Sequence, residues 1–386
     1  MTDRSGCGLA ELTIVQAVAA LSTGSDEAAS ARVLDEVDRR IGLGPSYAYP
    51  MVCDLTKPWV IPAPLLAISG NAGDRTFPQP AEPVHTECRL SRVGEVVVAA
   101  EAGTIAPVPA GLINGTWWRG AAQPPLDPFG VITALRHLID DPGLPDSQLL
   151  HFAGGPISTT GSELTGDFEA LTRGRRTTIR EAARITRTDA PVPPAAAEPS
   201  RKRGPFKLTD SPGPRPRPVH LIIDSVPRHI CEPDLVEEIT GAIRPENWDP
   251  PYPPAGTPPQ PADLHDRLAA SVLPIAEIRS ESRQAYIRLE IRLRPGSDPL
   301  RVLAQLARMD GLAVGLAAQF PAPLAGLLRS WTDACRHQDI TTSLDQLEAA
   351  IRADQLDQQD LLELTCGGSS CQLRELGDHA RPRPLT

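Results

Sequence analysis

The stretch Pro83-Val84-His85-Thr86-Glu87-Cys88-Arg89-Leu90 decides the fold and the function that this sequence predicts. Four further blocks surround it in the chain. They are, in order, Tyr49-Pro50, Lys57-Pro58-Trp59, Gly70-Asn71-Ala72-Gly73 and Leu112-Ile113-Asn114-Gly115. The Gly-Asn-Ala-Gly block is typical of a turn, because glycine and asparagine tolerate the backbone angles that turns need. No block is decisive alone, so the argument depends on their order along the chain.

In this order the blocks resemble the DNA-cleaving A subunit of bacterial type IIA topoisomerases, the gyrase and topoisomerase IV family, over roughly residues 10–335. In that family the central stretch reads Met-Arg-Tyr-Thr-Glu-Ala/Ile-Arg-Leu. The matching residues are Thr86, Glu87, Arg89 and Leu90. The position of the family's tyrosine nucleophile is His85 here, and the position of its neighbouring arginine is Val84. The resemblance therefore predicts a protein that keeps the family's fold and lacks its catalytic residues.

The resemblance implies an α+β fold with a winged-helix domain and a tower-like α/β domain. The family's C-terminal coiled coil and β-propeller are expected to be missing. We expect a winged-helix and degenerate catalytic domain over 1–105, a tower-like domain over 106–330, and a short helical tail over 331–386. The tower-like domain would contain Pro-rich loops at 190–218 and 245–261, a composition typical of flexible segments.

The composition limits the classes of protein to which this chain can belong. The chain has 386 residues, enough for two or three domains. No apolar run approaches the length of a membrane span, and the N-terminus does not have the pattern of a signal peptide. Seven scattered cysteines favour a reducing, cytoplasmic location, associated with the nucleoid if the protein binds DNA. The formal net charge of −10 argues against extensive DNA binding, which depends on clustered Lys and Arg.

Hydrophobic periodicity predicts the main helices and strands. Helices are expected at 9–21, 28–41, 129–140, 232–243, 298–309, 324–335 and 344–364, the last as one helix or two. Strands are expected at 219–226 and 287–293, where apolar and charged residues alternate in the second. The short apolar runs 59–61 and 65–68 fit either a strand or a buried helix end, and residues 96–100 form a third apolar run.

Several side chains are candidates for contact with double-stranded DNA. By resemblance the helix at 28–41 is the recognition helix of the winged-helix unit, and it carries Arg32, Arg39 and Arg40 among acidic residues. The other candidates are Trp117, Trp118, Arg173, Arg175 and Arg176. The two tryptophans could wedge between base pairs, although buried packing or a partner contact is the more common role of such a pair. The family's His-Pro-His-Gly-Asp motif after the recognition helix is replaced by residues 41–45, in which only the glycine remains.

The family's reaction needs groups that this sequence lacks. A tyrosine oxygen attacks a backbone phosphate, the neighbouring arginine stabilises the developing charge, and Mg²⁺ is held by carboxylates of the B subunit. His85 could form a phosphoramidate as an unusual nucleophile, but Val84 supplies no cation beside it. We expect no cofactor in this chain. Cys366 and Cys371, even with His379, leave a zinc site short of ligands, so a terminal tail without metal is expected.

Three functional hypotheses remain from the sequence. The first is a catalytically inactive protein, similar to the family's A subunit, that binds DNA or a gyrase B-type partner. The second is a divergent, ATP-hydrolysing DNA topoisomerase that uses His85 together with such a partner and its Mg²⁺. The third is a protein-interaction scaffold without DNA binding. In each case a homodimer through the winged-helix region is possible, and no membrane contact is expected.

Overall fold

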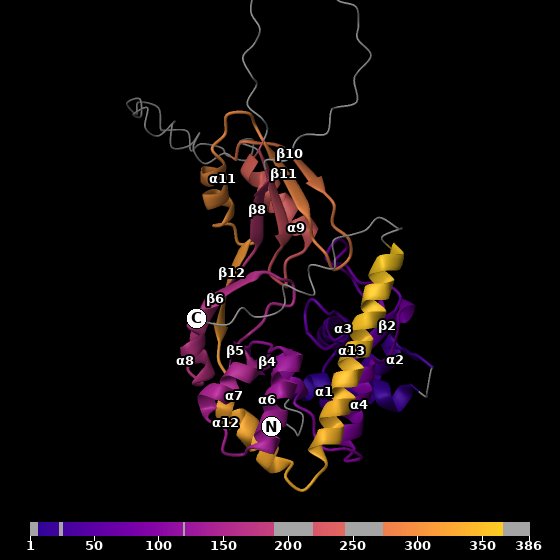
Figure 1. The fold of residues 1–386 in the computed structure, drawn as a ribbon. Coiled ribbons are helices and arrows are strands. Elements are labelled where there is room, and N and C mark those ends of the chain that lie inside the picture. Colours follow the sequence, from indigo (N-terminus) through magenta and orange to yellow (C-terminus); the bar gives the residue numbers. More distant parts are fainter. Residues whose placement is uncertain (1–6, 23–25, 119, 189–218, 244–272, 366–386) are drawn as a thin grey trace, which may run out of the picture.

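The computed structural model describes the chain apart from residues 1–6, 23–25, 119, 189–218, 244–272 and 366–386. The described residues form a mixed α+β fold with three sheets (Figure 1). Two separate hydrophobic cores lie inside it. The first unit, residues 7–182 and 313–365, contains one core, and the second unit, residues 184–312, contains the other. No described helix has both the length and the apolar character that crossing a membrane requires.

The first unit begins with three helices and a small antiparallel sheet. In chain order its elements are α1 (Leu9–Leu21), β1 (Ala28–Ala29), α2 (Ser30–Ile41), α3 (Pro45–Asp54), β2 (Leu66–Ser69), the 3₁₀ turn η1 (Pro83–His85), β3 (Glu87–Leu90) and α4 (Arg92–Glu101). The strands pair in the order β1-β3-β2. The helix expected from residue 28 begins instead at Ser30, because Ala28 and Ala29 pair with β3.

The connection between α2 and α3 is short and its geometry follows from its residues. Helix α2 ends at Gly42, whose φ of 66° lies in the left-handed region that favours glycine. Pro45 then occupies the first turn of α3, where the absent N–H of proline costs nothing. Between α1 and α2, by contrast, the chain passes through residues 22–29 and forms β1. The short helix–helix connection is therefore the one between α2 and α3.

A five-stranded sheet forms the rest of the first unit, with strand order β4-β5-β12-β7-β6. These strands are β4 (Thr116–Trp118), β5 (Ala121–Gln123), β6 (Glu163–Gly166), β7 (Thr177–Ala182) and β12 (Ala313–Ala318). The accompanying helices are α5 (Ala110–Asn114), α6 (Pro128–Asp140), α7 (Asp146–Ala153), α8 (Phe168–Thr172), α12 (Leu324–Ala334) and α13 (Ile340–Thr365). The first core extends from Cys7 to Ile179 and resumes from Ala318 to Ile351. A boundary near residue 105 therefore does not separate two hydrophobic cores.

The second unit is a four-stranded antiparallel sheet with two helices. Its strand order is β10-β11-β9-β8, with β8 (Arg184–Thr188), β9 (His220–Ser225), β10 (Ile275–Ser280) and β11 (Leu289–Leu293). Helices α9 (Glu232–Ile243) and α11 (Pro299–Leu306) complete it. The alternation in β11 buries Leu289, Ile291 and Leu293, as the sequence predicts for a half-exposed strand.

Helix α13 packs against the first unit rather than extending away from it. Its residues Leu344, Leu347 and Ile351 are buried in the first core, and α13 lies along α4 in Figure 1. Ion pairs fasten it at two points, from Arg92 of α4 to Asp357 at 2.9 Å and from Arg136 of α6 to Glu348 at 2.6 Å. The described part of the segment expected as a short tail thus contributes to the core, and its helix begins at Ile340 rather than Leu344.

Most predicted elements form where the sequence places them. Helix α1 has the expected bounds, and α6, α9, α11, β9 and β11 lie within a few residues of theirs. Of the two undecided runs, 65–68 largely coincides with β2 (Leu66–Ser69), whereas 59–61 forms neither a strand nor a helix. The third apolar run, 96–100, lies inside α4, which Ser91 caps because its hydroxyl accepts a 2.9 Å hydrogen bond from the Gly94 amide.

Close packing of α4 generates a first prediction. A β-carbon at Gly94 would lie 2.0 Å from the Leu65 carbonyl oxygen, whereas one at Gly326 in α12 would meet nothing within 4 Å. We expect Gly94→Ala to lower the free energy of unfolding by about 1–3 kcal/mol through overpacking. Gly326→Ala, the matched helical control, should raise it by up to about 1 kcal/mol. Urea denaturation followed by circular dichroism measures both, and equal effects at the two sites would contradict the packing described here.

Candidate functional site

The segment 83–90 folds as an exposed turn that leads into a strand. Residues 83–85 form η1, and 87–90 form β3 at the centre of the small sheet. Val84 is 65% exposed, and His85 is also exposed. The two positions where the resemblance places catalytic groups therefore both face solvent, and the side chain at 84 offers no hydrogen bond or charge.

Thr86 fixes this turn to the helices beside it. Its side chain is buried, and its hydroxyl donates to Ser30 Oγ at 2.8 Å and lies 3.1 Å from Tyr49 Oη. Tyr49 in α3 donates in turn to the Ala81 carbonyl at 2.7 Å, and burial raises the pKa of its phenol. Three hydroxyl groups thus join α2, α3 and the loop before β3. The matching threonine has a structural role in this chain.

The glycines of the turn block also have steric reasons. Gly70 has a φ of 98°, and a β-carbon there would lie 2.8 Å from the His85 carbonyl oxygen. Gly73 has a φ of 75°, and its β-carbon would lie 2.4 Å from the Pro78 carbonyl oxygen. Asn71 closes the turn by accepting from the Gly73 amide at 2.8 Å. The loop over residues 70–86 therefore depends on the Gly-Asn-Ala-Gly block for its shape.

Two of the remaining matched residues, Glu87 and Arg89, lie on the exposed face of β3, and the third, Leu90, is half-buried. The Arg89 guanidinium is 3.5 Å from the Glu27 carboxylate and donates to the Leu90 carbonyl at 3.3 Å. Arg89 is thus engaged with its own surroundings. As the sequence indicates, it is not the residue beside position 85, so Val84 leaves that neighbouring position without a cation.

The arginines expected on the recognition helix are largely neutralised within α2. Glu36 forms ion pairs of 2.7 Å with both Arg39 and Arg40. Hydrogen bonds from these two guanidinium groups lower the pKa of Glu36 to about 2. Arg32 is exposed and has no hydrogen-bond or ion-pair partner among the described residues. Of the three α2 candidates, Arg32 alone presents an uncompensated charge.

The second group of candidates gathers at the five-stranded sheet. Arg173 pairs with Glu169, four residues earlier, at the exposed end of α8. Arg175 is exposed, and Arg176 donates to the Gly120 carbonyl at 3.2 Å. That bond places the arginine loop beside the β4–β5 turn. Trp117 and Trp118 belong to the edge strand β4, while the placement of their side chains lies outside what the structure describes.

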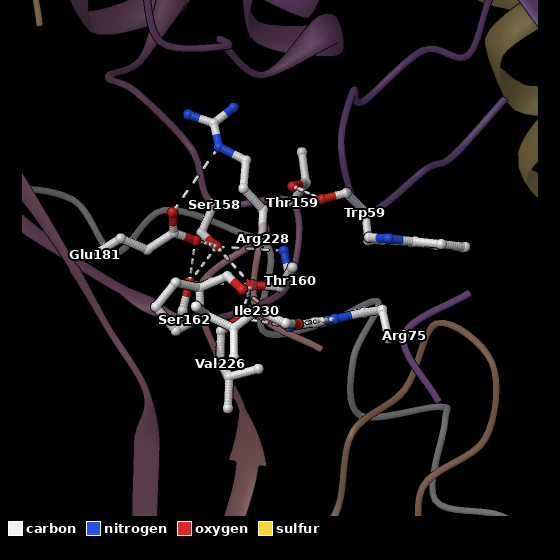
Figure 2. A network of polar contacts seen from close by, with 11 residues as sticks. Trp59, Arg75, Ser158, Thr159, Thr160, Ser162, Glu181, Val226, Arg228 and Ile230 are labelled. Carbon is white, nitrogen blue, oxygen red and sulfur yellow. Dashed lines mark hydrogen bonds and ion pairs between the residues drawn. The ribbon is translucent and has the colours of Figure 1, made fainter. Parts of the chain in front are cut away.

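A buried polar cluster, which sequence reasoning missed, lies between the two units (Figure 2). Glu181 of β7 is only 4% exposed, and its Oε1 accepts hydrogen bonds from Ser162 at 2.5 Å and Ser158 at 3.1 Å. Arg228 Nε lies 3.9 Å from Glu181 Oε2, and burial lowers the pKa of this guanidinium. The hydroxyl-rich run Ser158-Thr159-Thr160-Gly161-Ser162 was the one signal that could have found it.

The contacts of this cluster connect segments of the fold and do not form a catalytic centre. The Glu181 carboxylate is satisfied by hydroxyl groups that tie the 158–162 turn to β7. Thr159 donates to the Trp59 carbonyl at 2.5 Å, and Thr160 donates to the Val226 carbonyl at 2.8 Å. An enclosed cavity of about 20 Å³, lined in part by Glu181 and Arg228, has room for one water molecule. No imidazole contacts the serines here, so the cluster lacks the base of a serine nucleophile.

Metal binding finds no support within the described part of the chain. There, no three His, Cys, Asp or Glu side chains are grouped so that they could hold a metal ion. Cys366, Cys371 and His379 lie outside the described residues, so the expectation for this tail stays a prediction.

Together with the mixed α+β fold and an exposed turn at 83–85 that lacks tyrosine, comparison with known proteins points to a gyrase A-like family. The chain is 25% identical over 312 residues to the chloroplastic/mitochondrial DNA gyrase A subunit of Nicotiana benthamiana, a match that covers 74% of this chain and 28% of that protein. It is 24% identical over 316 residues to the DNA gyrase A subunit of Deinococcus deserti, covering 76% of this chain and 33% of the relative. No family model matches. The chain thus corresponds to about a third or less of the length of these relatives.

The hydroxyl network around Thr86 generates a second prediction. Thr86→Val keeps the shape of the side chain and leaves Ser30 Oγ without its donor, so we expect the free energy of unfolding to fall by about 1–3 kcal/mol. Thr178→Val, on an exposed position of β7, should change it by less than about 0.5 kcal/mol. Thermal or urea unfolding of both variants measures the difference. If Thr86→Val behaved like Thr178→Val, the network would not hold the turn in place.

Proposed function

We propose that this chain is a gyrase A-like protein that does not cleave DNA and acts by binding, either to double-stranded DNA or to a gyrase B-type subunit. The observation that carries this proposal is the contrast within one segment. Thr86, Gly70 and Gly73, which match the family, have contacts or backbone angles that the fold needs. Val84 and His85, which replace the reacting groups, are exposed and hold nothing together.

A winged-helix assignment is part of this proposal. The element order α1-β1-α2-α3-β2-β3 and the strand order β1-β3-β2 support it, and the 70–86 loop would be the wing. The short connection makes α2 and α3 the helix-turn-helix pair, so α3 rather than the 28–41 helix would enter a major groove. Residues 106–330 would then form the tower-like α/β region.

The charges suggest that any DNA binding is modest. Helix α3, Pro45–Asp54, contains neither Lys nor Arg, and its exposed Tyr47 is the residue best placed to contact a groove. Arg39 and Arg40 are held by Glu36, so Arg32, Arg175 and Arg176 supply the charges available to phosphates. Few phosphate contacts imply weak binding that salt abolishes easily.

The same surface supports a second candidate, a protein-interaction scaffold. Tyr47 and Phe77 are each 73% exposed and Val84 is 65% exposed, all in the N-terminal three-helix part of the first unit. Exposed aromatic and aliphatic side chains without neighbouring cations suit a protein partner better than a phosphate backbone. A second copy of the chain, paired through this part, would be one such partner. Binding to a B-type subunit without DNA would favour this candidate.

The enzyme alternative requires His85 to act as a nucleophile. It would need Mg²⁺ from a B-type partner and a cation that position 84 does not supply.

The proposal also includes a cytoplasmic location, at the nucleoid if DNA binding is present.

The first experiment is a titration of a linear DNA duplex with the full chain across a range of salt concentrations. Binding that weakens steeply as salt rises would support a surviving phosphate-contacting surface. Absence of binding at low salt would remove DNA from the proposal. The ligand to test by co-purification would then be the gyrase B-type subunit.

The α2 ion pairs generate a third prediction. Glu36→Gln removes the carboxylate that holds Arg39 and Arg40, so DNA affinity at low salt should rise. Its salt dependence should steepen by about 0.9 in the log–log slope for each arginine that then contacts a phosphate. Asp333→Asn makes the same change of charge beside Arg336, on the exposed end of α12, and should leave the slope unchanged. Equal effects of the two variants would show that only net charge matters and that α2 does not face the DNA.

Loss of the cleavage chemistry generates a fourth prediction. With supercoiled DNA, Mg²⁺, ATP and a B-type gyrase subunit, the chain should form no covalent protein–DNA adduct after denaturation with detergent. His85→Ala should behave identically. An adduct that the wild-type chain forms and His85→Ala does not would establish the enzyme alternative instead.

A further inference from the structure

The two units are joined by a narrow neck of two neighbouring strands. Only Ala183 separates β7 of the first unit from β8 of the second, and the chain returns through Leu312 into β12. The Ala183 amide donates to the Leu312 carbonyl at 2.7 Å, so the two crossings are bonded to each other. The apolar cores of the two units are separate. Among the described residues, no apolar contact as extensive as either core therefore attaches the second unit to the first.

A single residue of the wing-like loop, Arg75, provides the main attachment away from the neck. Its guanidinium donates to the Val226 and Pro227 carbonyls, each at 3.0 Å, and to the Ile230 carbonyl at 3.1 Å. Figure 2 shows this side chain reaching the 226–230 segment beside the buried polar cluster. All three acceptors belong to the loop between β9 and α9 in the second unit.

The backbone of Arg75 adds two bonds to the same unit. Its amide donates to the Gln284 carbonyl at 3.0 Å, and its carbonyl accepts from the Glu232 amide at 2.8 Å. Gln284 lies in the turn between β10 and β11 and has a φ of 43°, unusual for a residue with a side chain. The attachment thus holds one backbone position of the second unit in a conformation that is disfavoured in isolation.

The side chain of Arg75 is 2% exposed, and among the described residues no carboxylate lies within ion-pair distance of it. Burial lowers the pKa of this guanidinium to about 10. A buried cation bonded only to neutral carbonyls loses its hydration, and this loss offsets most of what its hydrogen bonds contribute. When the contact between Arg75 and the second unit opens, the guanidinium regains its hydration. The free-energy cost of this opening is therefore far smaller than that of opening an apolar interface of the same area.

The rest of the seam between the units is polar as well. Thr160 donates to the Val226 carbonyl, and Arg228 approaches Glu181 at 3.9 Å with its Nε lacking a direct hydrogen-bond partner. A water-sized cavity borders both Glu181 and Arg228, and the rest of its lining comes from the first unit. Polar interfaces between separately packed units are those that open most readily.

From this geometry we infer that Arg75 is a releasable latch, and that the second unit, 184–312, swings on the β7–β8 and Leu312–β12 neck when the latch opens. The turn between β10 and β11 and the 226–232 loop separate from the 70–86 loop, while both apolar cores stay intact. Figure 1 shows the neck at β12 and the β10–β11 turn on different sides of the molecule, as a hinge and its latch require. This inference does not depend on the proposed function.

Hydrogen exchange on the full chain tests it. In the wild type, the amides of Arg75 and Glu232 should exchange through an opening that is more frequent than the openings exposing Leu221 or Ile291. In Arg75→Met, which keeps the length of the side chain and removes its donors, exchange at the Glu232 amide should rise at least tenfold. Protection of Leu221 and Ile291 in the second core should be unchanged.

Arg329→Met is the matched control, since Arg329 donates to the Pro142 and Leu144 carbonyls within the first unit only. It should leave exchange at Glu232 unchanged. The inference is overturned if, in the wild type, the seam amides exchange no faster than those of the cores. It is also overturned if Arg75→Met and Arg329→Met alter Glu232 equally. If Arg75→Met does not fold, the comparison of seam amides with core amides in the wild type still tests the inference.

Discussion

The arrangement of this protein depends on a buried guanidinium surrounded by backbone carbonyls. The Arg75 side chain extends from the 70–86 loop and donates hydrogen bonds to the carbonyls of Val226, Pro227 and Ile230 in the second unit. The same loop carries His85 at its other end and is tied to α2 and α3 through Thr86. The loop therefore connects the N-terminal helices to the second unit, and the position of the exposed 83–85 turn is set by hydroxyl and guanidinium bonds rather than by apolar packing.

Several arginines of the molecule form ion pairs with carboxylates of the same chain. Glu36 holds two arginines on α2, Glu169 holds Arg173, and Arg136 fastens α13 through Glu348. Surface pairs of this kind contribute little to stability, but each one removes an arginine from the set that could meet a phosphate. Together with a net charge of −10, this pattern restricts any DNA contact to a few side chains. Because so few cationic side chains remain for phosphates, the proposal that the chain binds a protein partner has nearly as much support as the proposal that it binds DNA.

Similarity to the A subunit of DNA gyrase persists where the fold needs particular residues. Asn114 is buried and bonds to both the amide and the carbonyl of Ala63, and a β-carbon at Gly115 would lie 2.4 Å from the Gln123 carbonyl oxygen. Gly70, Gly73 and Thr86 are constrained in the same way. Val84 and His85 have no comparable constraint, since both face solvent. A chain can therefore keep these blocks in order while the reacting groups change.

The sequence by itself determined many of the helices and strands and the residues that stand at positions 84 and 85. Local periodicity and capping are encoded within a few residues, so the bounds of α1, α6 and β11 could be predicted, as could the absence of tyrosine and arginine at positions 85 and 84. Only the tertiary structure decided that α2 packs against both α1 and α3, that α13 packs on α4, and that Arg75 and the polar cluster around Glu181 join the two units. These contacts connect residues up to about 260 positions apart, as between Val93 and Asp354. No local pattern records them, because an arginine or a serine carries the same sequence signal whether it is solvated or buried among carbonyls.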